Sequence, residues 1–300
     1  MPHQTPNPSR PQDYFRLLKP RVMSLVVFSS LVGLMMAKSM ADNHQHHWVI
    51  DLLAIMFIAM GAGAAGALNM WVDKDIDGKM FRTMNRPLPQ KIISSDNALT
   101  FGLLFAIFSV LLLGFTTNYL AAGLLALTIF YYVVIYSVIL KKRHIYNVVI
   151  GGVAGALPPV IGFVTILPQF YWQAWLLFFI IFFWTPPHSW ALAIFRNKDY
   201  KRANIKMLPA VLGFKNTAYQ MVGYSFCLLL TSLLFFVSDL TSDLVNYLLL
   251  SLTMWFFLLS LQFLFLHQDK QKFTLVAKKF FYYSIFYLFF FLLAIMIDIW

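Results

Sequence analysis

Three oxygen-bearing side chains recur at a spacing of four residues, namely Asn69, Asp73 and Asp77. In a helix this spacing keeps side chains on one face, with a drift of only about 40° per step. Carboxylate and amide oxygens suit a hard cation such as Mg²⁺, which proteins often bind through one or two carboxylates together with substrate phosphates. The pattern therefore predicts a Mg²⁺ site along one helix face.

Basic residues follow this acidic stretch directly, at Lys79, Arg82 and Arg86. Arginine can hold phosphate oxygens with two parallel hydrogen bonds. A cation site beside an anion clamp predicts the binding of a metal–diphosphate pair. The alternative is an ordinary charged loop beside a membrane span, in which the aspartates only neutralise the basic residues.

A second cluster, RNKDYKRANIKMLP at 196–209, again combines an aspartate, Asp199, with several basic residues. Two acidic sites that face each other can hold a diphosphate between divalent ions, which neutralise the leaving group as its carbon–oxygen bond breaks. We therefore expect the two clusters to face each other across one chamber.

The composition is that of an integral membrane protein. Of the 300 residues, 60% are hydrophobic and 12% are charged, whereas a soluble domain carries about 25% charged residues. The single cysteine, Cys227, excludes a disulfide framework and a cysteine-based metal site.

A membrane span needs about 20 mostly apolar residues, and the two longest apolar runs must be divided at 116–119 and 166–173. The nine predicted spans are 21–40, 49–71, 97–117, 119–140, 146–166, 171–195, 216–238, 244–266 and 277–298.

The charges separate cleanly between the two ends of these spans. All 23 lysines and arginines except Lys38 fall in the N-terminal segment with the start of the first span, or in the loops after the even-numbered spans and the first residues that follow these loops. The positive-inside rule then places the N-terminus and both acidic clusters in the cytoplasm and Trp300 outside. The basic pI thus has a topological explanation that requires no nucleic-acid partner.

The first residues are polar and rich in proline, and they resemble neither a signal peptide nor a transit peptide. We expect a disordered tail over 1–15, followed by a single transmembrane domain over 16–300. A multi-pass protein of the bacterial inner membrane, all-α and with its active site toward the cytoplasm, is the predicted architecture.

The N-x-x-x-D-x-x-x-D pattern after the second span and the aspartate site after the sixth resemble the UbiA-type intramembrane prenyltransferases. Within that superfamily the closer resemblance is to the heme O synthases, the branch that farnesylates protoheme IX. This resemblance covers roughly residues 12 to 215, where Ala203 stands in place of a further aspartate of the ring-prenylating relatives. The supporting stretches are NMWVDKDIDGKMFRTMNRPLP, YSVILKKRHIYNVVIGG, ALPPVIGF, WTPPHSWALAIFR and DYKRANIKMLP.

The resemblance implies a helix bundle around a central cavity and a Mg²⁺-dependent reaction. Farnesyl diphosphate ionises, a vinyl group of heme B captures the farnesyl cation, and water adds to give heme O. A heme O oxidase is a candidate partner. The implied metal and diphosphate ligands are Asn69, Asp73, Asp77 and Asp199. The implied diphosphate or heme-propionate contacts are Arg82, Arg86, Lys142, Arg143 and Lys201.

Several histidines are candidate heme or metal ligands, and each has an alternative role as a hydrogen-bonding or solvated residue. His188 lies in a Pro-Pro-His step inside the sixth span, and polar residues at this depth usually face a cavity. It could bind heme, or it could hydrogen-bond to a neighbouring helix. His144 could contact a propionate or be a solvated loop residue, and the cluster at 44–47 could bind a metal or be solvated. The small residues at 61–67 and 151–155 predict close helix packing.

Two rival functions remain open. Prenylation of an aromatic ring in quinone synthesis would use the same superfamily, although the missing second aspartate disfavours it. A membrane transporter belongs to a different class. Transporters usually place their charged sites near the bilayer midplane, whereas these acids lie at the membrane boundary, which favours an enzyme.

Overall fold

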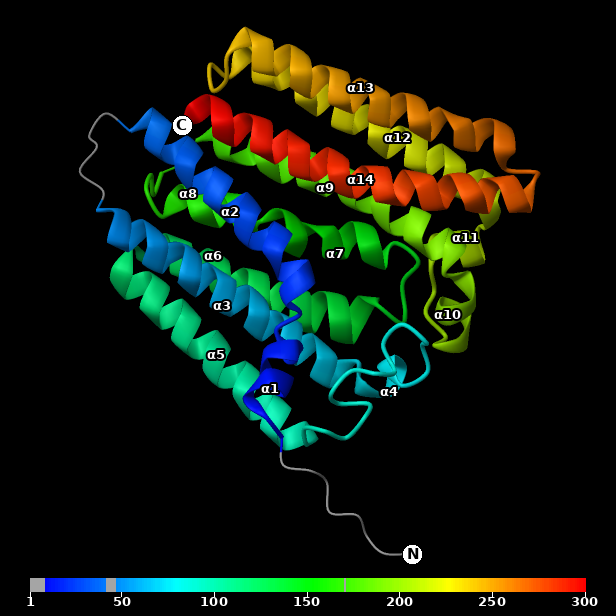
Figure 1. Ribbon diagram of the computed structural model, residues 1–300, viewed down its shortest axis with the longest axis horizontal. Helices are drawn as coiled ribbons and strands as arrows, with labels where there is room; N and C mark the ends of the chain where they lie inside the picture. The colour runs from blue at the N-terminus through cyan, green and yellow to red at the C-terminus, as the bar shows by residue number, and fades with distance from the viewer. Residues whose placement is uncertain (1–8, 42–46, 170) are drawn as a thin grey trace, which may run out of the picture.

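The computed structural model describes residues 9–41, 47–169 and 171–300, and every regular element in these ranges is helical (Figure 1). In this described part of the chain, nine segments are long and apolar enough to cross a membrane, which confirms the predicted number. The nine segments are α2 (Pro20–Met40), α3 (Trp48–Val72), α5 (Ser95–Thr116), α6 with the π-helix η1 (Tyr119–Phe130 and Tyr131–Leu140), α7 with α8 (Asn147–Ala156 and Pro158–Val164), α9 (Trp172–Phe195), α12 with η2 (Gly213–Leu233 and Leu234–Val237), α13 (Asp243–Leu266) and α14 (Lys270–Ile299).

Four shorter helices complete the chain: α1 (Pro11–Leu17), α4 (Lys74–Asp77), α10 (Asn197–Arg202) and α11 (Leu208–Val211). Helix α1 corrects the expectation of a disordered tail over 1–15, because residues 11–15 are helical. Leu17 is fully buried in an apolar cluster with Ala67, Met70 and Leu88, so packing against α3 orders this segment. Residues 1–8 lie outside the described ranges.

The junction between α5 and α6 lies where the sequence predicted a break. Asn118 caps α6, since its Oδ1 accepts from the Ala121 N–H at 2.9 Å and such a cap satisfies a free helix donor. After Phe130 the same span continues as a π-helix, with the Lys141 N–H bonded to the Tyr136 carbonyl at 2.9 Å. Because π-helices often occur at functional sites, this change of pitch bears on the site described below.

Small residues allow helices to approach closely. A Cβ on Gly33 of α2 would lie 2.0 Å from the Pro159 carbonyl oxygen, and one on Gly162 of α8 would lie 2.0 Å from the Ser30 carbonyl oxygen. The predicted packing role also holds for Gly61 and for Gly151, whose Cβ would meet the Tyr136 ring at 2.2 Å. At Gly155, by contrast, an added Cβ would meet nothing within 4 Å.

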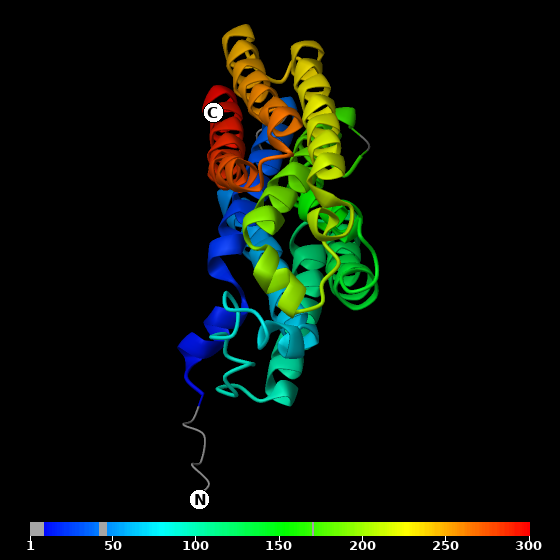
Figure 2. The same cartoon turned by 90° about the vertical axis from the view of Figure 1, so that its right-hand side faces the viewer.

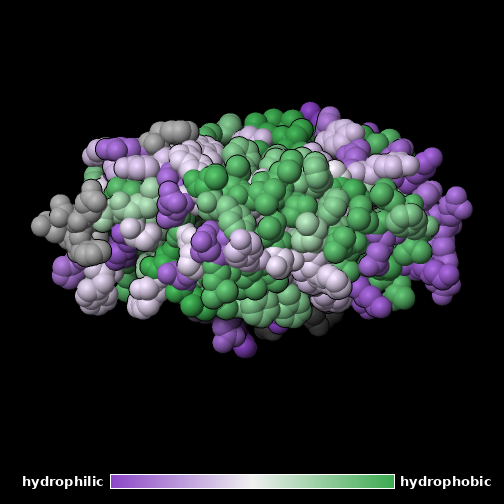
Figure 3. All heavy atoms as spheres, turned by 90° about the horizontal axis from the view of Figure 1, so that it is seen from above, coloured by the Kyte–Doolittle hydropathy of each residue, from purple (hydrophilic) through white to green (hydrophobic). Residues whose placement is uncertain are grey.

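Helix α9 lies inside the bundle and packs on α7, α12 and α14. The short helices α4, α10 and α11 gather at one end of the bundle (Figures 1 and 2). On the face shown in Figure 3, hydrophobic side chains cover the middle and hydrophilic ones gather toward both ends. Large apolar side chains such as Phe265 and Leu244 are more than four-fifths exposed. This surface suits a lipid environment in which the short helices lie at the membrane boundary.

Candidate active site

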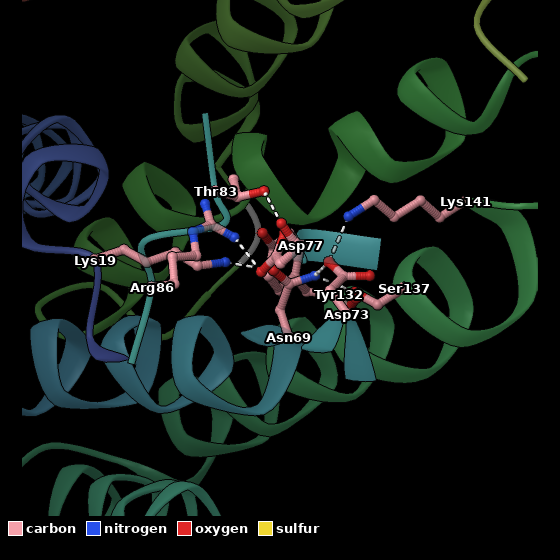
Figure 4. Close-up of polar contacts among 9 residues, drawn as sticks. All are labelled: Lys19, Asn69, Asp73, Asp77, Thr83, Arg86, Tyr132, Ser137 and Lys141. Atoms are coloured by element: carbon pink, nitrogen blue, oxygen red, sulfur yellow. Dashed lines mark hydrogen bonds and ion pairs between the residues drawn. The ribbon is translucent and has the colours of Figure 1, made fainter. Parts of the chain in front are cut away.

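Asn69, Asp73 and Asp77 lie on one face across the junction between α3 and α4 (Figure 4). The sequence suggested one continuous helix through all three residues. The structure instead has two helices, α3 and α4, with Asp73 as the residue between them. The i→i−4 pattern nevertheless persists: the Asp73 N–H bonds to the Asn69 carbonyl at 2.9 Å and the Asp77 N–H to the Asp73 carbonyl at 2.8 Å. All three side chains are buried, whereas Asp75 is exposed.

The amide of Asn69 connects three parts of the structure. Its Nδ2 donates to Asp73 Oδ2 at 2.9 Å and to Ser137 Oγ on η1 at 2.7 Å. Its Oδ1 accepts from Lys19 Nζ. Since every polar atom of this amide is engaged, its orientation is fixed.

Three cationic side chains contact the trio directly. Arg86 Nη1 lies 2.6 Å from Asp77 Oδ2, Lys141 Nζ is paired with Asp73 Oδ2, and Lys19 Nζ bonds to Asn69. Arg86 was predicted from the sequence as a site residue. Lys19 and Lys141 were used only among the basic residues that indicate the membrane topology. Lys141 adjoins Lys142 and Arg143, which were predicted instead. These two are exposed and do not line the cavity described next.

Lys19 reaches the site through an uncommon backbone conformation. Its φ of 52° lies in the left-handed region, directly before Pro20 at the start of α2. Burial, aided by the neighbouring charges of Arg86 and Lys141, lowers the pKa of Lys19 from 10.5 to about 7. Asp73 and Asp77 oppose this effect only partly. A strained residue that carries a perturbed ammonium group is typical of a functional site.

The polar cluster opens into a cavity of about 200 Å³. Its lining combines charged groups with apolar side chains. Among the apolar ones, Met80, Val148, Ile205 and Met207 pack in one cluster, with Tyr200 against it. The lining residues are Lys19, Val22, Asn69, Asp77, Met80, Arg82, Arg86, Tyr132, Tyr136, Lys141, Asn147, Val148, Ser189, Leu192, Tyr200, Ile205 and Met207.

The segment after α3 and the segment after α9 meet at this cavity, as the sequence predicted for the two charged clusters. Arg202 stacks over Phe81, with 4.3 Å from its guanidinium carbon to the ring centre, a favourable cation–π geometry. Asp199 is 6% exposed and bonds through its side chain to no described residue. Its neighbour Tyr200 lines the cavity, but Asp199 itself does not, and neither does the exposed Lys201. Arg82 does line it.

The predicted histidines lie elsewhere. His188 Nδ1 is 2.6 Å from Ser284 Oγ on α14, and its ring stacks between Trp184 and Phe281. This is the hydrogen-bonding alternative, and His188 is not among the cavity-lining residues. His144 is exposed, and its Nδ1 accepts from the Tyr146 N–H at 3.2 Å. In the cluster at 44–47, residues 44–46 fall outside the described ranges, so the predicted alternatives there stay open.

The donor set fits a divalent cation. Asp73 Oδ1 is buried and accepts no hydrogen bond from any described residue. A buried carboxylate oxygen normally has a partner, and an oxygen without a proton donor suits a hard cation. No group of three or more histidine, cysteine or acidic side chains gathers as a metal site within the described ranges. Any cation would therefore share this site with an amide oxygen or a substrate.

Sequence comparison places the chain among known proteins. The sequence profile of the UbiA prenyltransferase family matches residues 26–294. A protein named protoheme IX farnesyltransferase from Rhodopseudomonas palustris (strain ATCC BAA-98 / CGA009) is 55% identical over 216 residues, which are 72% of this chain and 68% of the relative. A protein of the same name from Rickettsia bellii (strain OSU 85-389) is 45% identical over 275 residues, which are 92% of this chain and 89% of the relative.

Solved structures share the fold. A structure of digeranylgeranylglyceryl phosphate synthase superimposes with a TM-score of 0.75 and 16% identity, over 96% of this chain and 98% of the other. A UbiA homologue from Archaeoglobus fulgidus bound to DMAPP and Mg²⁺ superimposes with a TM-score of 0.60 and 16% identity, over 92% of this chain and 99% of the other.

Proposed function

Because the chain belongs to the UbiA prenyltransferase family, we propose that it transfers the farnesyl group of farnesyl diphosphate to a vinyl group of heme B. Addition of water completes heme O, and diphosphate leaves. The relatives named protoheme IX farnesyltransferase, which match over most of the chain, support this acceptor. The observation that carries the reaction type is the buried trio of Asn69, Asp73 and Asp77, which is bonded to three cationic side chains and of which Asn69 and Asp77 line the cavity.

We propose that Asn69, Asp73 and Asp77 hold Mg²⁺ and that Asp199 approaches from the opposite segment. Bound there, Mg²⁺ would neutralise the charge that develops on the diphosphate as its carbon–oxygen bond breaks. Arg86, Lys19 and Lys141 pair with the trio when no substrate is bound, and they can turn to the phosphate oxygens when it is. Their ammonium and guanidinium groups form charge-assisted hydrogen bonds, the strongest kind available.

Arg82 differs from the other cavity cations, since it forms no ion pair or hydrogen bond with a described residue. It is therefore available to a propionate of heme B or to the diphosphate. The exposed Lys142, Arg143 and Lys201 are weaker candidates for direct contact, and they contribute to the positive field at this end of the bundle.

We also propose that the site faces the cytoplasm of a bacterium and that the chain lies in the inner membrane. The support is the sequence pattern, in which all lysines and arginines except Lys38 belong to the same set of segments as the two acidic clusters. A heme O oxidase is the proposed recipient of the product.

The test is a reconstitution assay with purified protein, farnesyl diphosphate, Mg²⁺ and either heme B or 4-hydroxybenzoate. We expect a farnesylated, hydrated heme by mass spectrometry and no farnesylated benzoate. A prenylated benzoate would instead support the quinone-type enzyme. Failure to consume farnesyl diphosphate with either acceptor would overturn the enzyme assignment and favour a transporter.

A further inference from the structure

We propose that Asn147 and Ser189 bind the water molecule that completes the product. The proposal rests on the function proposed above. After the vinyl group has captured the farnesyl cation, the positive charge lies on the carbon next to the porphyrin ring. Water can add there, forming a carbon–oxygen bond, with its proton passing to the departing diphosphate. Alternatively, the adjacent CH₂ loses a proton, and an alkene forms in place of the alcohol.

Addition of water therefore outcompetes loss of the proton only if a water molecule is already bound beside the cation. The charged side of the cavity is poorly suited to hold it, because Asn69 and Asp77 are already bonded to neighbouring side chains. Away from the charged groups the lining is mostly apolar, and its polar groups are the side chains of Asn147 and Ser189 and the phenols of three tyrosines, Tyr132, Tyr136 and Tyr200. A polar group within an apolar wall can fix one water molecule at a defined place.

Asn147 is 1% exposed and presents a single, fixed acceptor to the cavity. Both hydrogens of its Nδ2 are engaged, one with the His144 carbonyl at 2.7 Å and the other with the Lys206 carbonyl at 3.0 Å. Rotating the amide by 180° would set its oxygen against two carbonyl oxygens, so the orientation is determined. Oδ1 remains, and it bonds to no described residue.

Ser189 supplies a hydroxyl that is also unengaged within the described ranges. Helical serine and threonine residues usually donate to the carbonyl one turn earlier. Thr185 follows this pattern, with 2.7 Å to the Ile181 carbonyl, whereas Ser189 on the next turn does not. Its hydroxyl can therefore donate to a water molecule or accept from it.

The two groups lie at the same level of the bundle. Helices α7 and α9 pack together, and a Cβ on Gly152 would lie 3.3 Å from Thr185 Cγ2. Asn147 lies five residues before Gly152, and Ser189 lies four residues after Thr185. In successive spans of opposite direction, these offsets are about 7.5 and about 6 Å toward the same end. Both side chains thus reach the cavity at nearly equal depth.

The test measures how the product divides between alcohol and alkene. Wild-type enzyme and the variants Ser189→Ala and Asn147→Leu turn over farnesyl diphosphate and heme B in ¹⁸O-labelled water. Mass spectrometry then separates the labelled heme O from the product that is lighter by one water. We expect the ratio of alkene to alcohol to rise about three- to tenfold in each variant, as for the loss of one neutral hydrogen bond.

Two further variants make the result specific. Ser189→Thr keeps a hydroxyl and should restore the wild-type ratio. Ser109→Ala removes a buried hydroxyl that bonds back to Ala106 at 2.8 Å outside the cavity lining, and it should leave the ratio unchanged.

A slower reaction with an unchanged ratio in both test variants would overturn the proposal, because it would show a purely structural role. A shift in Tyr200→Phe but in neither test variant would do the same. If the wild-type enzyme made no farnesylated heme at all, the proposed function itself would fail. That outcome is distinct from an alcohol made equally well by every variant.

Discussion

Arg86 reaches back to Asp77, and only 2.6 Å separate Nη1 from Oδ2. The carboxylate is almost fully buried, and Thr83 binds the carbonyl of the same aspartate at 3.0 Å. The loop after α4 is therefore folded back onto the acidic trio. Residues that the chain places after the membrane span thus form one wall of the site.

Removing a carboxylate of the trio should abolish turnover while the protein still inserts into the membrane. For Asp73→Ala and Asp77→Ala we expect heme O formation to fall at least about 100-fold, because each loses a charged ligand at the developing negative charge. The exposed Asp75 provides the matched control, and Asp75→Asn should keep near-normal activity. Chelation of divalent ions should abolish heme O formation by the wild-type enzyme. Activity that survives in Asp73→Ala but not in Asp75→Asn would contradict the assigned face.

Lys141 and Lys142 are adjacent, yet we expect them to differ sharply. Lys141 pairs with the buried Asp73 and lines the cavity, whereas Lys142 is exposed. Lys141→Met should raise the KM for farnesyl diphosphate by at least about tenfold, as expected for the loss of one charged hydrogen bond. Lys142→Met should change it by less than about threefold, because solvent screens an exposed charge. Equal effects, measured by initial rates at saturating heme B, would argue against direct contact by Lys141.

The lowered pKa of Lys19 predicts a pH-dependent stability. Its value of about 7 lies below the ordinary 10.5, so the unfolded chain binds more protons between these values. Stability of the substrate-free protein should therefore rise as the pH increases from about 7 toward about 10 and fall as it drops back to about 7. Thermal unfolding in detergent should show this rise in the wild type and a weaker one in Lys19→Met. Lys201→Met, which removes an exposed lysine, should behave like the wild type.

Close contact between α2 and α8 predicts unequal tolerance of alanine at two glycines. Gly162→Ala would place a methyl group 2.0 Å from the Ser30 carbonyl oxygen, so the helices would have to separate. Gly155→Ala meets nothing within 4 Å and removes backbone freedom from a helix, a change worth roughly 0.5–1 kcal/mol in its favour. Thermal unfolding should show a lower midpoint for Gly162→Ala and an unchanged or higher one for Gly155→Ala. A similar loss in both would mean that α2 and α8 adjust easily.

The nine spans could be predicted because length and hydropathy alone define a membrane crossing. The acidic trio could be predicted because its spacing of four persists across the junction at Asp73. Lys141 could not, since residues 131–140 form a π-helix and the periodicity expected of an α-helix misplaces the residues at its end. Lys142 and Arg143 were implied by the family resemblance alone, which does not show which residues of this basic run reach the cavity.

Other parts of the site depend on contacts between distant segments. Lys19 has a left-handed backbone at the junction between α2 and α1, which packs on α3, and nothing in the local sequence predicts this conformation. The partner of His188 lies on α14, 96 residues away, so spacing within the sixth span could not choose between a ligand and a structural contact. Asn147 likewise acquires its orientation from the Lys206 carbonyl, which only the folded chain brings near.

The pairing of Asp73 and Asp77 with Lys141 and Arg86 has a consequence for the order of events. In the resting state each acid already has a counter-ion, and Lys19 adds further positive charge nearby. A bare divalent ion would meet electrostatic repulsion on entering, whereas an ion already complexed to an anionic lipid precursor would not. Under the proposed function, Mg²⁺ would therefore enter the cavity bound to the prenyl diphosphate and would leave together with the released diphosphate.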